Sequence, residues 1–183
     1  KYRWDVTQTA EARPMVKAEL VCKDFGALKV LKGITPWPAV GSAKFCKNID
    51  GGNRIVAKDH REAVSVIAND LRRFQKESNL DEVVVVNLAS TERWPDLSDP
   101  TLNSTAAFEK GLDSSDESIS PAMLYAYAAI KSGVPYANFT PSVAADVPAL
   151  LELARELNVP VAGKDGKTGQ TMMKTVLAPA FKA

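Results

Sequence analysis

The sequence has few cysteines and almost no histidine, and this shortage excludes several classes of protein. Its 183 residues include two cysteines, Cys22 and Cys46, and one histidine, His60. Two cysteines are too few for a disulfide scaffold, and they favour a cytoplasmic protein. With His60 they are also too few for a Cys/His zinc site. A histidine-based catalytic triad would have to use His60, which we instead expect to be a surface residue at a helix start.

An excess of one charge and long apolar runs are missing as well. The chain has 23 basic and 22 acidic side chains, and its net charge of +1 gives no reason to expect a nucleic acid or a membrane as partner. No apolar run approaches the roughly 20 residues that span a bilayer, and no secretory signal is recognisable. Apolar residues make up 45% of the chain and charged residues 25%, which is typical of a globular protein of about one domain.

What the sequence does contain is a repeated alternation of strand and helix patterns. The predicted strands are Val83–Leu88, 134–139 and 159–162, and the predicted helices are 59–78, 120–131 and 146–157. Such an alternation with short loops predicts right-handed β-α-β crossovers, and therefore an α/β fold with a doubly wound, mainly parallel sheet. We expect Val83–Leu88 to be a central strand buried on both faces, because four consecutive valines are apolar on both sides.

Polar residues follow each predicted strand. After the first strand these are Asn87, Ser90, Thr91 and Glu92, and after the second they are residues 140–142. Open parallel sheets bind their ligands at the carboxyl ends of the strands, so these residues are candidates for polar contacts to a ligand. They are also good turn formers, and the sequence alone does not decide between the two interpretations.

A glycine-bearing loop follows the third strand and precedes an amphipathic stretch, 172–181. The loop contains Gly163, Gly166 and Gly169, with side-chain donors on Lys167, Thr168 and Gln170. Free N–H groups at a helix start, together with the helix dipole, are suited to hold an anion such as a phosphate. A simple connector between strand and helix is the alternative. The loop is neither a Walker A sequence nor a dinucleotide-binding G-x-G-x-x-G pattern.

Three segments together resemble the myo-inositol-1-phosphate synthase family: 87–92, 120–142 and 163–174. The resemblance covers roughly residue 41 to the C-terminus. It implies a longer chain, in which a Rossmann-type NAD-binding domain is interrupted by a second, oligomerising α+β domain. Residues 1–183 would then be part of the NAD-binding catalytic domain. The family's glycine-rich N-terminal loop and its C-terminal part, with the catalytic lysines, would lie outside this chain.

The resemblance also implies an activity. Family members are isomerases of the intramolecular lyase type, which convert D-glucose 6-phosphate to 1D-myo-inositol 3-phosphate in inositol and phospholipid biosynthesis. Oxidation at C5 by NAD is followed by enolisation, by an aldol closure of C6 onto C1, and by reduction. The implied cofactor is NAD, the implied substrate a sugar phosphate and the implied assembly a cytoplasmic homotetramer. A metal or monovalent cation is left open.

The resemblance assigns roles to single residues. It implies that the substrate phosphate is held by Lys167, Thr168, Gly169 and Gln170. It implies that the cofactor lies along Asn87, Ala89, Ser90 and Thr91, and that Asp165 is the catalytic carboxylate. Lys164 departs from the family, which has a carboxylate or an asparagine there. Two alternatives stay open: a Rossmann-fold dehydrogenase acting on another sugar phosphate, and a non-catalytic nucleotide- or metabolite-binding relative.

Overall fold

The computed structural model describes residues 37–46 and 53–166, together with residues 175, 177–179 and 181. The elements in chain order are α3 (His60–Glu77), β1 (Val85–Asn87), a short 3-10 helix η1 (Pro100–Leu102), α4 (Thr105–Ser114), α5 (Pro121–Lys131), β2 (Tyr136–Asn138), α6 (Pro148–Glu156) and β3 (Val161–Gly163). The predicted strand–helix alternation is therefore confirmed. Of the amphipathic stretch 172–181, residues 175, 177–179 and 181 are helical, and the others lie outside the described residues.

The three strands form one parallel sheet in the order β1-β2-β3. In register, Asn87 of β1 lies opposite Asn138 of β2, which lies opposite Gly163 of β3. The strands thus end at the same level, and the three loops that follow them begin side by side at one edge of the sheet. The predicted parallel α/β class is confirmed.

Helix α5 is the core of the molecule. It is buried along almost its whole length, and it packs against α3, α6 and β2. Small residues such as Ala126 and Ala129 bring it close to its neighbours. Its ends are those that the sequence predicts: the Ser120 hydroxyl accepts from the Met123 N–H, and Gly133 follows with φ of +73°.

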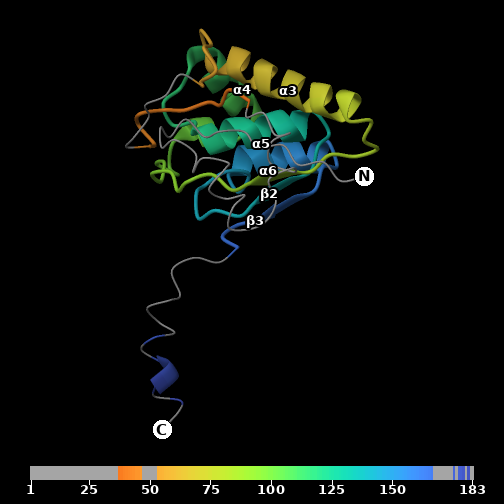
Figure 1. Cartoon of the computed structure of the whole chain (residues 1–183). Coiled ribbons are helices and arrows are strands. Elements are labelled where there is room, and N and C mark those ends of the chain that lie inside the picture. Colours follow the sequence, from red (N-terminus) through yellow and green to blue (C-terminus); the bar gives the residue numbers. More distant parts are fainter. Residues whose placement is uncertain (1–36, 47–52, 167–174, 176, 180, 182–183) are drawn as a thin grey trace.

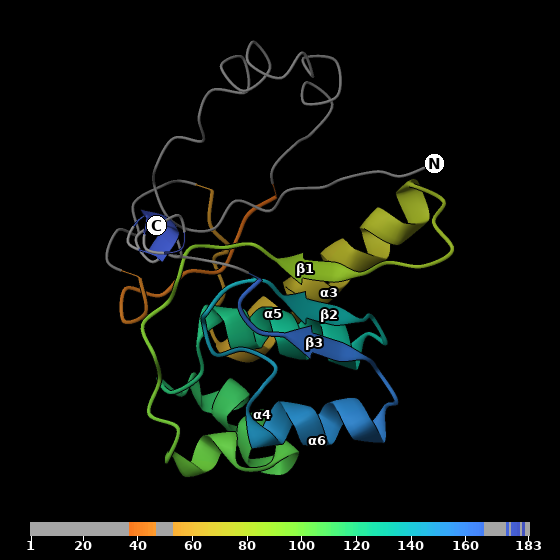
Figure 2. The same cartoon turned by 90° about the horizontal axis from the view of Figure 1, so that it is seen from below.

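The described helices cover one face of the sheet. Figure 1 shows this arrangement from the side, and Figure 2 shows it from below, with the strands in front. The expectation that 83–88 is a central strand buried on both faces is wrong for this structure. Within the described residues β1 is an edge strand paired with β2 alone. Val85 packs against the core, whereas Val84, Val86 and Leu88 are 58%, 48% and 69% exposed. Alternate residues of a strand face opposite sides, so every second apolar side chain lies on the uncovered face.

Helix α3 begins close to the predicted position and its start is capped by Asp59, but its first residue, His60, differs from expectation. The Asp59 carboxylate accepts from the Glu62 N–H at 2.7 Å, and the Glu62 carboxylate accepts from the Lys58 N–H at 2.7 Å. His60 is half-buried rather than a surface residue, and its Nδ1 has no hydrogen-bond partner among the described residues. Burial lowers the pKa of His60 below its usual value, although the charges of Asp116 and Asp59 oppose this.

Two further expectations concern absences, and they are checked on the described part of the chain. None of its helices is both long enough and apolar enough to cross a bilayer. It also contains no group of three His, Cys, Asp or Glu side chains that could hold a metal ion.

Candidate functional site: the carboxyl edge of the sheet

Asn138 is the centre of the edge at which the three strands end. The residue is 6% exposed, and its Oδ1 accepts from Asn87 Nδ2 at 3.2 Å. The same oxygen accepts from the Thr140 N–H at 3.1 Å and the Thr140 hydroxyl at 2.8 Å. Its Nδ2 donates to the Ser142 carbonyl at 2.7 Å. One buried amide therefore fixes the end of β1 and the loop after β2 relative to each other.

The residues expected along the cofactor follow directly from Asn87. Its Oδ1 accepts from the Ala89 N–H at 3.1 Å, which turns the chain at the end of β1. Ala89 is half-buried, while Ser90 and Thr91 are exposed. The structure thus brings all four residues to the carboxyl edge. The Asn87 side chain fixes the turn, because its Nδ2 donates to Asn138 and its Oδ1 accepts from Ala89. Ser90 and Thr91 lie on the accessible side.

Glu92 differs from its neighbours because it is buried, at 8% exposure. Its N–H donates to the Ser142 hydroxyl at 2.9 Å, and its Oε1 accepts from the Ala122 N–H at 3.0 Å. Its Oε2 is buried without a hydrogen-bond partner in the described part of the chain. Burial raises the pKa of Glu92 to about 7, against the opposing effects of the Ser120 hydroxyl and the Ala122 N–H. The sequence grouped Glu92 with the turn residues and gave no sign of its burial.

The loop after β3 lies along the loop after β2. The Asp165 N–H donates to the Thr140 carbonyl at 3.0 Å, and the Gly166 N–H donates to the Phe139 carbonyl at 3.1 Å. A Cβ on Gly166 would overlap the Phe139 ring. Gly163 has φ of +138°, and a Cβ there would come within 2.8 Å of the Asn138 carbonyl oxygen. Both glycines are therefore explained by the close approach of the two loops.

Asp165, the expected catalytic carboxylate, is exposed on this loop, directly beyond the end of β3. Its backbone has φ of +61°, in the left-handed region that aspartate tolerates better than most residues. The expected phosphate-binding residues come next, and Lys167, Thr168, Gly169 and Gln170 all lie outside the described residues. Of the glycine-bearing loop, the structure therefore describes residues 163–166.

Lys164, the residue that departs from the family pattern, connects all three loops of the edge. Its Nζ lies 2.7 Å from Asp146 Oδ2, on the segment between β2 and α6. It also lies 4.5 Å from the centre of the Trp94 ring, on the segment after β1. The ammonium group is thus neutralised by a carboxylate and covered by an aromatic face. The structure places this additional amine in a contact between loops.

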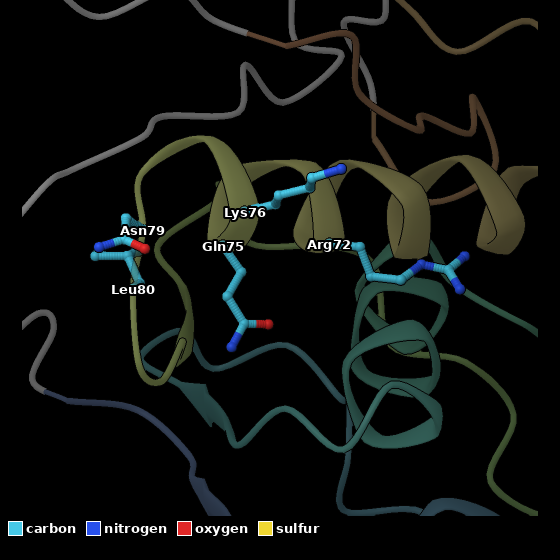
Figure 3. Close-up of a pocket in the computed structure, with 5 residues that line it drawn as sticks. All are labelled: Arg72, Gln75, Lys76, Asn79 and Leu80. Carbon is cyan, nitrogen blue, oxygen red and sulfur yellow. The ribbon is translucent and has the colours of Figure 1, made fainter.

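Two hollows of the surface are described, and neither is lined by residues 87–92 or 163–166. One of ≈ 280 Å³ is lined by Arg72, Gln75, Lys76, Asn79 and Leu80, shown in Figure 3. These residues come from the C-terminal half of α3 and the turn that leads into the amino end of β1. A second hollow of ≈ 230 Å³ lies at the start of α3, next to His60 and Ser115. Neither hollow contains a residue that the sequence singled out for chemistry, apart from His60.

The comparison with protein families gives one match that covers nearly the whole chain. A model for an NAD-binding domain, described as myo-inositol-1-phosphate synthase, matches residues 3–180. The match includes all three strand ends and the whole glycine-bearing loop.

Individual relatives agree with this match. Inositol-3-phosphate synthase 1 of Bacteroides thetaiotaomicron is 40% identical over 182 residues, which are 98% of this chain and 42% of that protein. Inositol-3-phosphate synthase of Dictyostelium discoideum is 35% identical over 182 residues, which are 95% of this chain and 35% of that protein. The chain therefore spans less than half the length of these relatives.

Two solved structures also match most of this chain, which again spans less than half of their length. The crystal structure of inositol-3-phosphate synthase from Caenorhabditis elegans matches with a TM-score of 0.72 and 28% identity, over 85% of this chain and 32% of that one. A myo-inositol-1-phosphate synthase-related protein from Thermotoga maritima matches with a TM-score of 0.60 at 24% identity, over 97% of this chain and 46% of that one, and supports the fold.

Proposed function

The chain belongs to the myo-inositol-1-phosphate synthase family, and from this premise we propose that it is part of an enzyme that converts D-glucose 6-phosphate to 1D-myo-inositol 3-phosphate with NAD. The observation that carries the proposal is the family match along residues 3–180. The match favours this isomerase over a dehydrogenase for another sugar phosphate and over a non-catalytic relative. The parallel sheet with three strand-end loops at one edge supports the proposal, because such edges bind ligands.

The residues at the carboxyl edge fit NAD. Ser90 and Thr91 are exposed hydroxyl residues on a turn that Asn87 and Asn138 fix in place. Neutral donors of this kind suit the ribose and pyrophosphate of a dinucleotide. Gly163 lets the chain approach the end of β2 closely, since a side chain there would meet Asn138. When bound, NAD would take a hydride from the substrate and return it at the end of the reaction.

The loop after β3 supplies the groups proposed to act on the sugar. Asp165 is exposed there, and in the proposal its carboxylate holds or moves a proton at the reacting carbon. Its N–H bond to the Thr140 carbonyl fixes the backbone that carries it. In the proposal, Lys167 and residues 168–170 bind the phosphate through side-chain donors and backbone N–H groups.

Several finer assignments form part of the proposal and rest on membership of the family alone. These are a homotetrameric assembly, a cytoplasmic location, a place in phospholipid biosynthesis and the use of a metal or monovalent cation. The described part of the chain offers no cluster of metal ligands.

Conversion of the sugar phosphate tests the proposal. The complete protein is incubated with glucose 6-phosphate and a small amount of NAD, and the products are followed by phosphorus NMR. We expect an inositol phosphate to accumulate far beyond the amount of NAD present, because the cofactor is regenerated in each turnover. Formation of NADH in step with an oxidised sugar phosphate would contradict the proposal and identify a dehydrogenase. Absence of any product would contradict it as well.

A further inference from the structure

Glu92 connects three parts of the fold that are distant in the sequence. It follows β1, it receives an N–H bond from Ala122 at the start of α5, and it gives its own N–H to Ser142 after β2. These partners are 30 and 50 residues away along the chain. Ser90 and Thr91 directly precede Glu92, so whatever holds Glu92 also fixes the positions of these two hydroxyl residues.

We propose that Glu92 is a positioning residue, whose buried carboxyl group latches the loop 88–93 onto the start of α5, while its backbone N–H holds the segment after β2, in the arrangement that presents Ser90 and Thr91 to the cofactor. The inference rests on the proposed function in so far as it concerns NAD. The latch itself is a property of this chain, and it can be measured without any ligand.

The surroundings of the carboxyl group indicate whether the neutral acid or the charged carboxylate holds the loop. Its Oε2 is buried without a partner, and none of the ion pairs within residues 37–46 and 53–166 includes Glu92. A buried charge without a counter-ion is strongly disfavoured. The burial that raises the pKa of Glu92 to about 7 therefore favours the neutral acid. Neutral Glu92 latches the loop, and its ionisation loosens it.

The neighbouring titratable groups do not supply the missing positive charge. The phenols of Tyr125 on α5 and Tyr136 on β2 lie close enough for their pKa values to be raised by the Glu92 charge. Asp70 of α3 acts on Tyr125 in the same direction, and Asp146 before α6 acts on Tyr136. Asp70 is paired with Arg73 and Asp146 with Lys164, so none of these groups offers Glu92 an unpaired positive charge.

Linkage then sets the direction of the pH effect. When the loop opens, Glu92 meets water and its pKa returns toward the ordinary value of 4.5. Between about pH 4.5 and about pH 7 the closed loop binds more protons than the open loop, so opening becomes easier as the pH rises. The protection of the loop amides against hydrogen exchange should fall steeply in this range, by up to about tenfold per pH unit.

The test is hydrogen exchange of residues 88–93 in the complete protein without ligand, at about pH 5 and about pH 7, corrected for the intrinsic exchange rate. In the wild type we expect protection to fall more than about tenfold between the two. Glu92→Gln keeps the shape of the neutral acid and cannot ionise, so its loop should keep the same protection at both. Glu82→Gln makes the same chemical change at an exposed position before β1 and should behave as the wild type does.

An equal pH response of the wild type and Glu92→Gln would overturn the inference. So would a wild-type loop with the same protection at both pH values, and that result needs no variant to fold. Saturating NAD at the higher pH should restore the protection of the wild-type loop. NAD that binds, as calorimetry would show, but leaves the protection unchanged would overturn the positioning role. A protein that does not bind NAD at all would overturn the proposed function instead, and the ligand-free comparison would still decide whether the latch exists.

Discussion

Two carboxylates at the same edge of the sheet are in opposite surroundings. Glu92 is buried at 8% exposure and bonded to the start of α5, whereas Asp165 is exposed on the loop after β3. Burial disfavours the charged form of a carboxyl group, so the two groups are suited to different tasks. Glu92 fixes the loop from the buried side of the edge, whereas Asp165 lies on its accessible side.

Glu92→Gln should change how the stability of the chain depends on pH. Because the pKa of Glu92 is raised to about 7 in the fold, the folded chain binds more protons than the unfolded chain between about 4.5 and about 7. The free energy of unfolding of the wild type therefore falls as the pH rises through this range, by up to about 3 kcal/mol. Glu92→Gln should lack this loss. Urea denaturation of the wild type and the variant at several pH values measures this difference. If the free energies of unfolding of the two proteins change with pH in the same way, the raised pKa of Glu92 is contradicted.

Asp165→Asn should reduce turnover by about a hundredfold, the usual scale for loss of a positioned acid–base or electrostatic group. The exchange preserves shape and removes charge. Since Asp165 is exposed, the melting temperature should stay close to that of the wild type. Steady-state rates of the complete protein test this prediction. Turnover within a few-fold of the wild type would reduce Asp165 to a structural loop residue.

The residues of the edge were predictable from the sequence to unequal degrees. Asn87, Ser90 and Thr91 follow an apolar run, and the rule that parallel sheets bind ligands at strand ends selects them. The burial of Glu92 was not predictable, because its partners Ala122 and Ser142 come from distant segments. No local pattern around residue 92 reports which helix start will lie above it.

At the scale of elements, the strand ends and the loops after them form one unit. The register of β1, β2 and β3 puts Asn87, Asn138 and Gly163 at the same level. The loop after β3 then follows the loop after β2 through two backbone hydrogen bonds. The glycine-bearing loop was predicted either to hold an anion or to be a simple connector. Gly163 and Gly166 have a reason in the packing of the loop on Asn138 and Phe139, and the residues predicted to hold the anion, 167–170, lie outside the described residues.

Gly163→Ala should destabilise the chain more than Gly166→Ala. Gly163 has φ of +138°, and its Cβ would approach a backbone oxygen that cannot move aside. Strain of this kind costs about 1–3 kcal/mol. A Cβ on Gly166 would meet the ring of Phe139, which is 52% exposed and can rotate into solvent. Thermal unfolding of the two variants makes the comparison. Equal small losses would show that the loop after β3 adapts without strain.

On the scale of the whole molecule, the sheet has one covered and one uncovered face. The described helices pack on the side of Val85, and Val84 and Val86 point to the other side. The strand–helix alternation predicted the parallel α/β class and the order of the elements. It did not predict the uncovered face, because a run of consecutive valines has no polar alternation that would reveal which side is bare.

Val85→Asp and Val86→Asp should separate the two faces of β1. Val85 packs against the core, so a carboxylate there should cost several kcal/mol of stability, on the order of the penalty for burying an unpaired polar group. Val86 is 48% exposed, so the same change should cost less than about 1 kcal/mol. Denaturant unfolding of this chain tests both. Similar losses at the two positions would contradict the one-sided packing.

Under the proposed function, this edge of the sheet belongs to an isomerase which takes a hydride from the substrate and returns it to the same carbon. The most direct measurement uses glucose 6-phosphate deuterated at C5, incubated with the complete protein and a trace of NAD. We expect an inositol phosphate that keeps its deuterium at the carbon derived from C5, while no reduced NAD accumulates. Deuterium that collects in the nicotinamide ring as an oxidised sugar phosphate builds up would contradict it.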